Sequence, residues 1–67
     1  MDVLKLKAAI VRAGYNQLKL ADEMGMSKNT LNAKVNGKSD ISLTEAVKLS
    51  KILNINTIEE KSEIFLS

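Results

Sequence analysis

The stretch at residues 16–38, NQLKLADEMGMSKNTLNAKVNGK, decides the fold of this chain. It predicts two short helices joined by a tight turn at Gly25, because apolar residues recur at helical spacing on both sides of that glycine. Ala21 lies four residues before Gly25, and Ser27 follows two residues after it. This spacing lets one helix cross close over the other and project its first turn away from the body of the protein.

The sequence outside this stretch predicts three further helices, so we expect an all-α fold in which residues 1–67 form one domain. All three glycines (Gly14, Gly25 and Gly37) fall between periodic segments, where helices need to end. The expected helices, counting the N-caps of the last three, cover residues 2–13, 17–24, 27–36 and 42–54 and a last segment that begins at 57.

Side chains that cap helices precede four of these segments. A side-chain oxygen at this position accepts a hydrogen bond from an otherwise unpaired backbone N–H in the first turn. The last two of these residues have a glutamate three positions later, which is the spacing of a capping box. The expected caps are Asn16, Ser27, Ser42 and Thr57.

Apolar residues at helical spacing predict which helix faces are buried. In the second helix they place Leu18, Ala21 and Met24 toward the core. In the first helix, Leu4 and Val11 form a second apolar stripe beside the main one. We therefore expect the first helix to be covered on two sides.

The composition excludes several classes of function. The chain has no cysteine and no histidine, so disulfides, thiolate metal sites and the commonest general base are absent. Its eight carboxylates show no clustering that suits a cation. We therefore expect no enzyme activity, cofactor, metal or small-molecule substrate. No apolar run approaches the ~20 residues that span a bilayer, and the N-terminus lacks a signal-peptide core. This predicts a cytoplasmic protein without a membrane partner.

Basic residues are concentrated in the first part of the chain. Residues 1–38 hold seven basic and three acidic side chains, whereas residues 39–67 hold three basic and five acidic ones. No acidic residue occurs between Met24 and Ser39, a stretch that contains three lysines. A domain with this asymmetry presents a positive face to phosphate groups.

The third helix separates an apolar face from a face of amides. Leu31 and Val35 lie about 40° apart around the helix axis and are expected in the core. An asparagine amide can pair with N6 and N7 of adenine, and an alanine methyl can rest on the thymine methyl. Lys28 in the first turn can reach a guanine edge or a phosphate. The face opposite the core carries Asn29, Ala33 and Asn36, with Asn32 on its flank.

Each of these positions also has an interpretation without DNA. The asparagines can be solvated side chains, and Ala33 can be a good helix former. Asn36 with Gly37 suits a helix C-cap, to which a phosphate contact would be additional. Gln17, a candidate phosphate contact, can be an ordinary polar residue at a helix start. The stem of Lys34 can simply cover the apolar face.

The combined pattern resembles a known family. Gln17-x3-Ala21-x3-Gly25-x-Ser27-x3-Leu31 is followed by an Asn-Gly-Lys loop and by a helix that ends in LSKILNI. This is similar to the helix-turn-helix of phage repressors and Cro proteins, the Xre-like family, over about residues 4–55. Residues 27–38 and the closing EEKSEIFLS resemble the short regulators of phages that infect Gram-positive bacteria.

The resemblance implies a five-helix, lambda-repressor-like domain whose third helix enters the major groove of double-stranded operator DNA. It implies a dimer on a palindromic operator and control of transcription in a bacterial host cell. By position, base contacts fall to Lys28, Asn29, Asn32 and Ala33. Backbone contacts fall to Asn16, Gln17, Ser27, Asn36 and Lys38.

The chain departs from the family pattern in two places. The family usually has an apolar residue where Lys34 stands, with Val35 here taking its place in the core, so the choice between Asn32 and Ala33 as a base contact stays open. The first base-contacting position is often glutamine in relatives, and Lys28 therefore implies a different operator sequence.

Two further questions stay open from the sequence. The same fold can serve as a protein-interaction module of the antitoxin or antirepressor kind, although the outward face of residues 28–36 presents amides, lysine and alanine rather than the large apolar anchors of docking surfaces. The apolar end of the chain is expected either to form the dimer contact or to fold back on Leu4 and Val11. The expected dimer residues are Ile64, Phe65 and Leu66.

Overall fold

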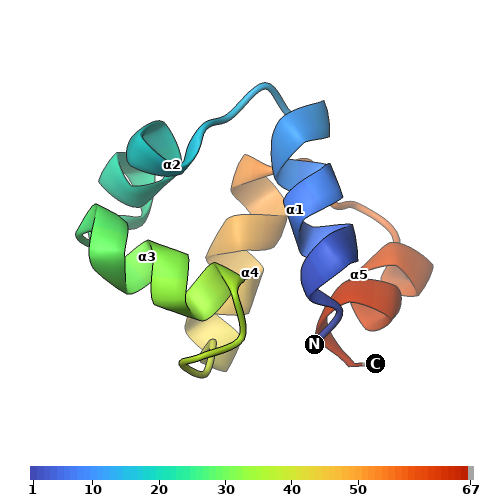
Figure 1. Cartoon of the computed structure of the whole chain (residues 1–67). Coiled ribbons are helices and arrows are strands. Elements are labelled where there is room, and N and C mark those ends of the chain that lie inside the picture. The colour runs from blue at the N-terminus through green and yellow to red at the C-terminus, as the bar shows by residue number, and fades with distance from the viewer. Residues whose placement is uncertain (67) are drawn as a thin grey trace.

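Five helices follow one another in a computed structural model that describes residues 1–66, and no strand occurs in that range (Figure 1). The all-α prediction is therefore confirmed. The helices α2 and α3 lie together at one side of the molecule, and α5 lies at the other, next to α1 (Figure 1). The helices are α1 (Val3–Arg12), α2 (Gln17–Met24), α3 (Lys28–Val35), α4 (Leu43–Ile52) and α5 (Ile58–Phe65).

The expected capping residues begin α2 to α5. Asn16 Oδ1 accepts a hydrogen bond from the backbone N–H of Lys19 at 2.8 Å. Ser27 and Thr57 accept in the same way from the backbone three residues later. Ser42 forms a complete capping box with Glu45, as predicted. These bonds satisfy donors that a helix leaves unpaired, which explains why the predicted helix starts are accurate.

The turn between α2 and α3 depends on Gly25. Its φ angle of 70° lies in the left-handed region. In this conformation the backbone N–H of Met26 donates to the carbonyl of Ala21 at 3.0 Å, and that of Gly25 donates to Asp22 at 3.1 Å. These two bonds are the Schellman ending of a helix, and they send the chain directly into the cap of α3.

Replacing Gly25 with alanine should destabilise the protein by about 1–2 kcal/mol, the cost of placing a side chain in the left-handed conformation. A Cβ at this position meets nothing within 4 Å, so backbone conformation is the only source of the loss. Denaturant unfolding would measure it. Gly14→Ala is the matched control, because Gly14 has a φ of 79° and equally open surroundings. Equal losses are expected, and an unchanged midpoint for Gly25→Ala would contradict this account.

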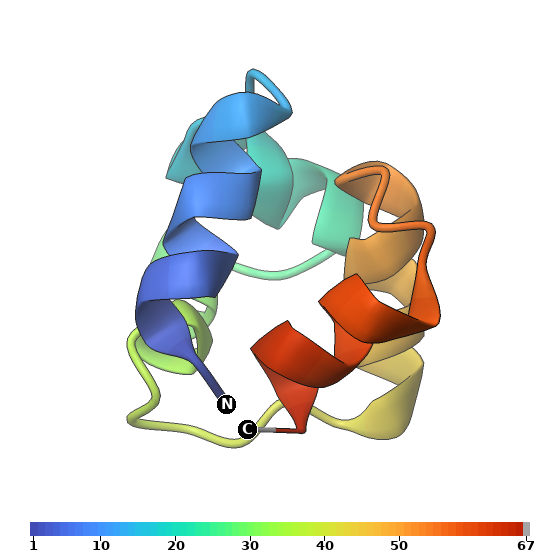
Figure 2. The same ribbon diagram turned by 90° about the vertical axis from the view of Figure 1, so that its right-hand side faces the viewer.

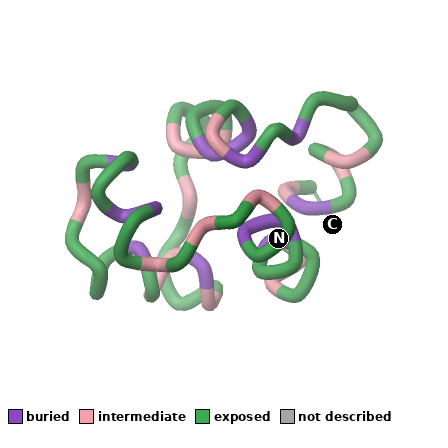
Figure 3. The backbone as a smooth tube through the Cα atoms, turned by 90° about the horizontal axis from the view of Figure 1, so that it is seen from above, coloured by how far each residue is buried: buried purple, intermediate pink, exposed green. Residues whose placement is uncertain are grey.

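One hydrophobic core is shared by all five helices. Buried positions lie on the inner sides of the helices, and exposed positions face outward (Figure 3). Partly buried residues such as Tyr15, Met26 and Phe65 pack around this core. The core consists of Leu6, Ala9, Ile10, Leu20, Ala21, Met24, Leu31, Val35, Leu49, Leu53, Ile55 and Ile64.

Two predictions about buried faces are wrong. Leu18 is 61% exposed, and Leu20 takes the inward position in α2 instead. These two residues lie about 200° apart around a helix axis, so they cannot both face the core. Leu4 and Val11 are also exposed, so α1 is covered on one side rather than two.

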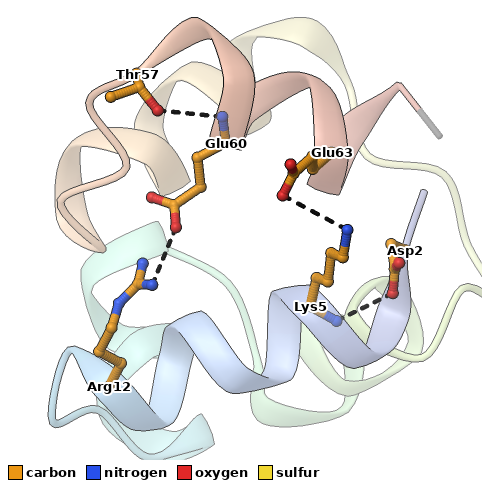
Figure 4. A network of polar contacts seen from close by, with 6 residues as sticks. All are labelled: Asp2, Lys5, Arg12, Thr57, Glu60 and Glu63. Atoms are coloured by element: carbon orange, nitrogen blue, oxygen red, sulfur yellow. Dashed lines mark hydrogen bonds and ion pairs between the residues drawn. The ribbon is translucent and has the colours of Figure 1, made fainter.

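The last helix packs against the first. The backbone N–H of Asp2 donates to the carbonyl of Ile64 at 2.7 Å, which brings the two ends of the described chain together (Figure 2). Ion pairs join the outer parts of the same helices, Arg12 with Glu60 at 3.0 Å and Lys5 with Glu63 at 3.5 Å (Figure 4). Because these pairs are largely exposed, the buried Ile64 side chain contributes more to holding α5 in place.

Candidate nucleic-acid interface

The orientation of α3 is set by its two buried residues. Leu31 and Val35 are almost completely buried, so the opposite side of the helix faces solvent. Lys28, Asn29 and Asn32 are exposed. Ala33 is half-buried. The structure thus places the four expected base-contacting residues on α3 with their most polar members open to solvent.

The N-terminal ends of α2 and α3 are held by their caps. Ser27 Oγ accepts from the backbone N–H of Thr30 at 3.1 Å and donates to the Thr30 hydroxyl at 2.9 Å. The side-chain oxygen of Asn16 likewise already accepts a hydrogen bond from the first turn of its own helix. Each of these two expected backbone contacts therefore has a structural task already. Gln17 is half-buried in the first turn of α2 and forms no hydrogen bond through its side chain within residues 1–66.

The asparagines of α3 differ in what their amides already bind. Asn36 Nδ2 donates to the backbone carbonyl of Asn32 and to its side-chain Oδ1, both at 2.8 Å. An amide that pairs with adenine uses both its oxygen and its nitrogen. The Asn32 side-chain oxygen therefore already accepts one hydrogen bond, whereas Asn29 has no hydrogen-bond partner for its side chain within the described chain. Asn29 is consequently the better placed of the two for bidentate pairing.

The loop after α3 begins with a second Schellman ending. Gly37 has a φ of 77°, and the backbone N–H of Lys38 donates to the carbonyl of Ala33 at 2.9 Å. Asn36 caps the helix, as the alternative interpretation of this residue had it. The Lys38 side chain is exposed on this loop.

Lys34 has a different environment from the other lysines of this region. Its ammonium lies 3.0 Å from the Glu45 carboxylate and donates to the backbone carbonyl of Asp40 at 2.9 Å. The two charged side chains are only 18% and 25% exposed. Hydrogen bonding from the Ser42 backbone, assisted by Lys34, lowers the pKa of Glu45 below its ordinary value of 4.5. This pair was not predicted, because nothing in the spacing distinguishes Lys34 from a solvated lysine.

The charge that remains available to phosphate groups is therefore carried by two lysines of this region. Lys28 and Lys38 form no ion pair with any residue the structure describes, whereas Lys34 is neutralised by Glu45. No carboxylate occurs in the sequence from Met24 to Ser39. The exposed face of α3 and the following loop thus combine hydrogen-bonding amides, a methyl group and uncompensated positive charge.

The expected dimer residues are distributed differently from the prediction. Ile64 belongs to the core of its own chain, which removes it from any contact with a second molecule. Leu66 is exposed, and Phe65 is half-buried. Further exposed apolar side chains adjoin them along a groove between α4 and α5. We call this region the α4–α5 apolar surface, and it comprises Leu43, Val47, Ile58, Phe65 and Leu66.

Comparisons with known proteins bear on this geometry. A family model described as helix-turn-helix matches residues 6–59, which include α2, α3 and the turn between them. Searches of curated proteins and of solved structures gave no match. Within residues 1–66, no cluster of potential ligands is suited to a metal ion, and no helix is long and apolar enough to cross a membrane.

Proposed function

This chain belongs to the helix-turn-helix family of the Xre and lambda-repressor type, and from that premise we propose that it binds a specific double-stranded operator and controls transcription from it. Proteins of this family are DNA-binding regulators of transcription. The observation that carries the proposal is the exposed face of α3, which offers amides, a methyl group and Lys28 without any negative charge. Such a face suits the major groove, where base edges present donors, acceptors and thymine methyls.

We assign separate tasks to two groups of residues. Base edges are contacted by Lys28, Asn29, Asn32 and Ala33. Phosphates are contacted by Asn16, Gln17, Ser27, Asn36 and Lys38. Backbone contacts fix the protein on the duplex without choosing a sequence, whereas groove contacts choose it. Since the Asn29 amide has no partner within the described chain, whereas the Asn32 amide is already held by Asn36, Asn29 is the residue proposed to pair with adenine.

We further propose that two copies of the chain associate through the α4–α5 apolar surface and together bind a palindromic operator. Leu43, Ile58 and Leu66 are among the most exposed large apolar residues of the chain. They adjoin one another around a groove on α4 and α5, whereas the base-contacting side chains are on α3. A second copy would cover these side chains while leaving both α3 helices available for DNA. A phage or prophage regulator acting in the cytoplasm of a bacterial host is the setting we propose.

Selection from a random duplex library at low and moderate salt tests this function. An enriched palindrome, with half-sites about one helical turn (~34 Å) apart, is expected for a dimer that contacts two major grooves. Retention that depends on salt without an enriched motif would reduce the function to weak phosphate binding. No retention at either salt would instead support a protein-interaction module on the same fold.

Two alanine variants test the division of tasks. Lys38→Ala should weaken binding to operator and random DNA alike, by about threefold to tenfold for one lost phosphate contact. Asn29→Ala should lose about 1–3 kcal/mol on the operator, because one bidentate pair disappears, and should relax the preference at one base pair. Titrations of both variants on both DNAs would measure this. Equal losses on operator and random DNA for Asn29→Ala would contradict the assignment.

A further inference from the structure

We propose that Lys34 and Glu45 are positioning residues for DNA recognition, because their ion pair fixes the loop that carries Lys38 and sets the rotation of α3 about its axis. The inference rests on the proposed function and deepens it. Neither residue is assigned a contact with DNA. We call the set formed by Lys34, Glu45, Ser42 and the Asp40 carbonyl the α3–α4 latch.

The latch joins three parts of the chain through four short bonds. The Lys34 ammonium, from the last turn of α3, reaches the Glu45 carboxylate in the first turn of α4 at 3.0 Å. The same ammonium donates to the Asp40 carbonyl in the connecting loop at 2.9 Å. The carboxylate oxygen that pairs with Lys34 also accepts from the Ser42 backbone N–H at 2.9 Å, and Ser42 Oγ accepts from the Glu45 N–H at 3.1 Å.

These bonds hold the far end of the loop at residues 36–42. Its near end is held by the backbone bond from Lys38 to Ala33. Most of the loop is exposed, so few buried side chains restrain it. The loop side chain Ile41 packs against the core, and the Lys34 ammonium adds a polar restraint from the helix that carries the base contacts. A phosphate contact by Lys38 requires this loop to keep one position relative to α3.

The latch also restrains the rotation of α3. Leu31 and Val35 anchor the helix from directions only about 40° apart, so they alone allow it to rock. Lys34 lies about 60° to the other side of Leu31, and its bonds to Glu45 and Asp40 fix that edge of the helix. Because a base contact is lost by small displacements, this edge determines how well the amide face meets the bases.

The variant Glu45→Gln distinguishes an effect of the latch from a general electrostatic effect, because the two predict opposite changes in operator affinity. Glu45→Gln raises the net charge by one, which strengthens attraction to DNA in general. Glutamine keeps the capping box, because its oxygen can still accept from the Ser42 backbone. The latch nevertheless loses its charged partner, so we expect operator affinity to fall about threefold to tenfold. Affinity for random DNA should fall less than operator affinity, because random DNA makes no base contact to lose and the added positive charge offsets a weaker Lys38 phosphate contact.

Glu59→Gln is the matched control for this change. Glu59 is an exposed carboxylate in the first turn of α5, and Glu45 is a partly buried one in the first turn of α4, so both changes raise the net charge by one and remove a carboxylate from a helix N-terminus. The control should keep its preference for the operator. Lys34→Met, which retains the apolar stem, should lose operator affinity by about tenfold. Lys51→Met removes an exposed lysine from the last turn of α4 and is the control for that variant.

The measurement is titration of each variant on the selected operator and on random duplex DNA, with melting curves to show that each is folded. The double variant Lys34→Met with Glu45→Gln should be little weaker than Lys34→Met alone, since both remove the same contact. Operator preferences that match the controls would overturn the latch while leaving the proposed function intact. Failure of the unaltered protein to select any motif would instead overturn the function.

Discussion

Leu31→Ala should remove about 3 kcal/mol of folding free energy, because it deletes a buried side chain and leaves a cavity. Leu31 is 1% exposed and anchors α3 to the core shared by the other helices. For a chain of 67 residues, the total stability is on the order of 3–10 kcal/mol, so this one change removes a large share of it. Urea unfolding at 25 °C would measure the loss, and operator binding should fail as α3 detaches.

Leu18→Ala is the control for that experiment. It makes the same chemical change on the neighbouring helix, but Leu18 is 61% exposed and makes no part of the core. Its expected effect is within about 0.5 kcal/mol, which is typical of surface substitutions. Similar losses for the two variants would show that the core assigned to α2 and α3 is wrong.

Val47→Asp should lower operator affinity by about 100-fold, the order of the avidity that is lost when two linked half-sites are bound separately. Val47 is 49% exposed and lines the groove of the α4–α5 apolar surface, so a carboxylate there is accommodated in one chain. Two such carboxylates facing each other across a dimer contact would be desolvated and repel. Titration on the full palindrome and on a single half-site would measure the effect.

The control for this variant is Leu4→Asp. It introduces the same charge on a helix surface, since Leu4 is 79% exposed on α1 and does not line the groove that contains Asn16 and Gln17. Its effect on operator binding should be limited to the general repulsion of one added charge from DNA. On the half-site alone, the two variants should bind equally. If they also bound the full operator equally, the α4–α5 apolar surface would not be the dimer contact.

Much of the fold was predictable because its signals are local. A cap such as Ser42 with Glu45 acts within one helical turn, and a glycine such as Gly25 ends a helix through its own backbone conformation. Local signals of this kind gave nearly all of the helix starts and ends. They also placed Leu31 and Val35 in the core, which determines the face of α3 that is exposed.

What could not be predicted depends on partners distant in sequence. Leu18 and Leu20 are the same residue type, and only the packing of α2 against its neighbours buries one and exposes the other. The pair formed by Lys34 and Glu45 requires α3 and α4 to be placed first. The spacing of apolar residues does not distinguish an exposed residue such as Val47 from a core residue. The sequence therefore predicted only the part of the α4–α5 apolar surface formed by Phe65 and Leu66.

The bond between Asp2 and Ile64 makes the backbone of the described chain almost a closed ring. When the two ends of a chain lie together in this way, the packing of the helices does not depend on where along the chain the termini are placed. The contacts between α2 and α3 are formed by near neighbours in sequence, whereas the ion pair of α1 with α5 joins Lys5 and Glu63, which are 58 positions apart. A permuted gene that joins the present ends by a short linker and begins between α4 and α5 would therefore encode the same packing with the helices in a new order.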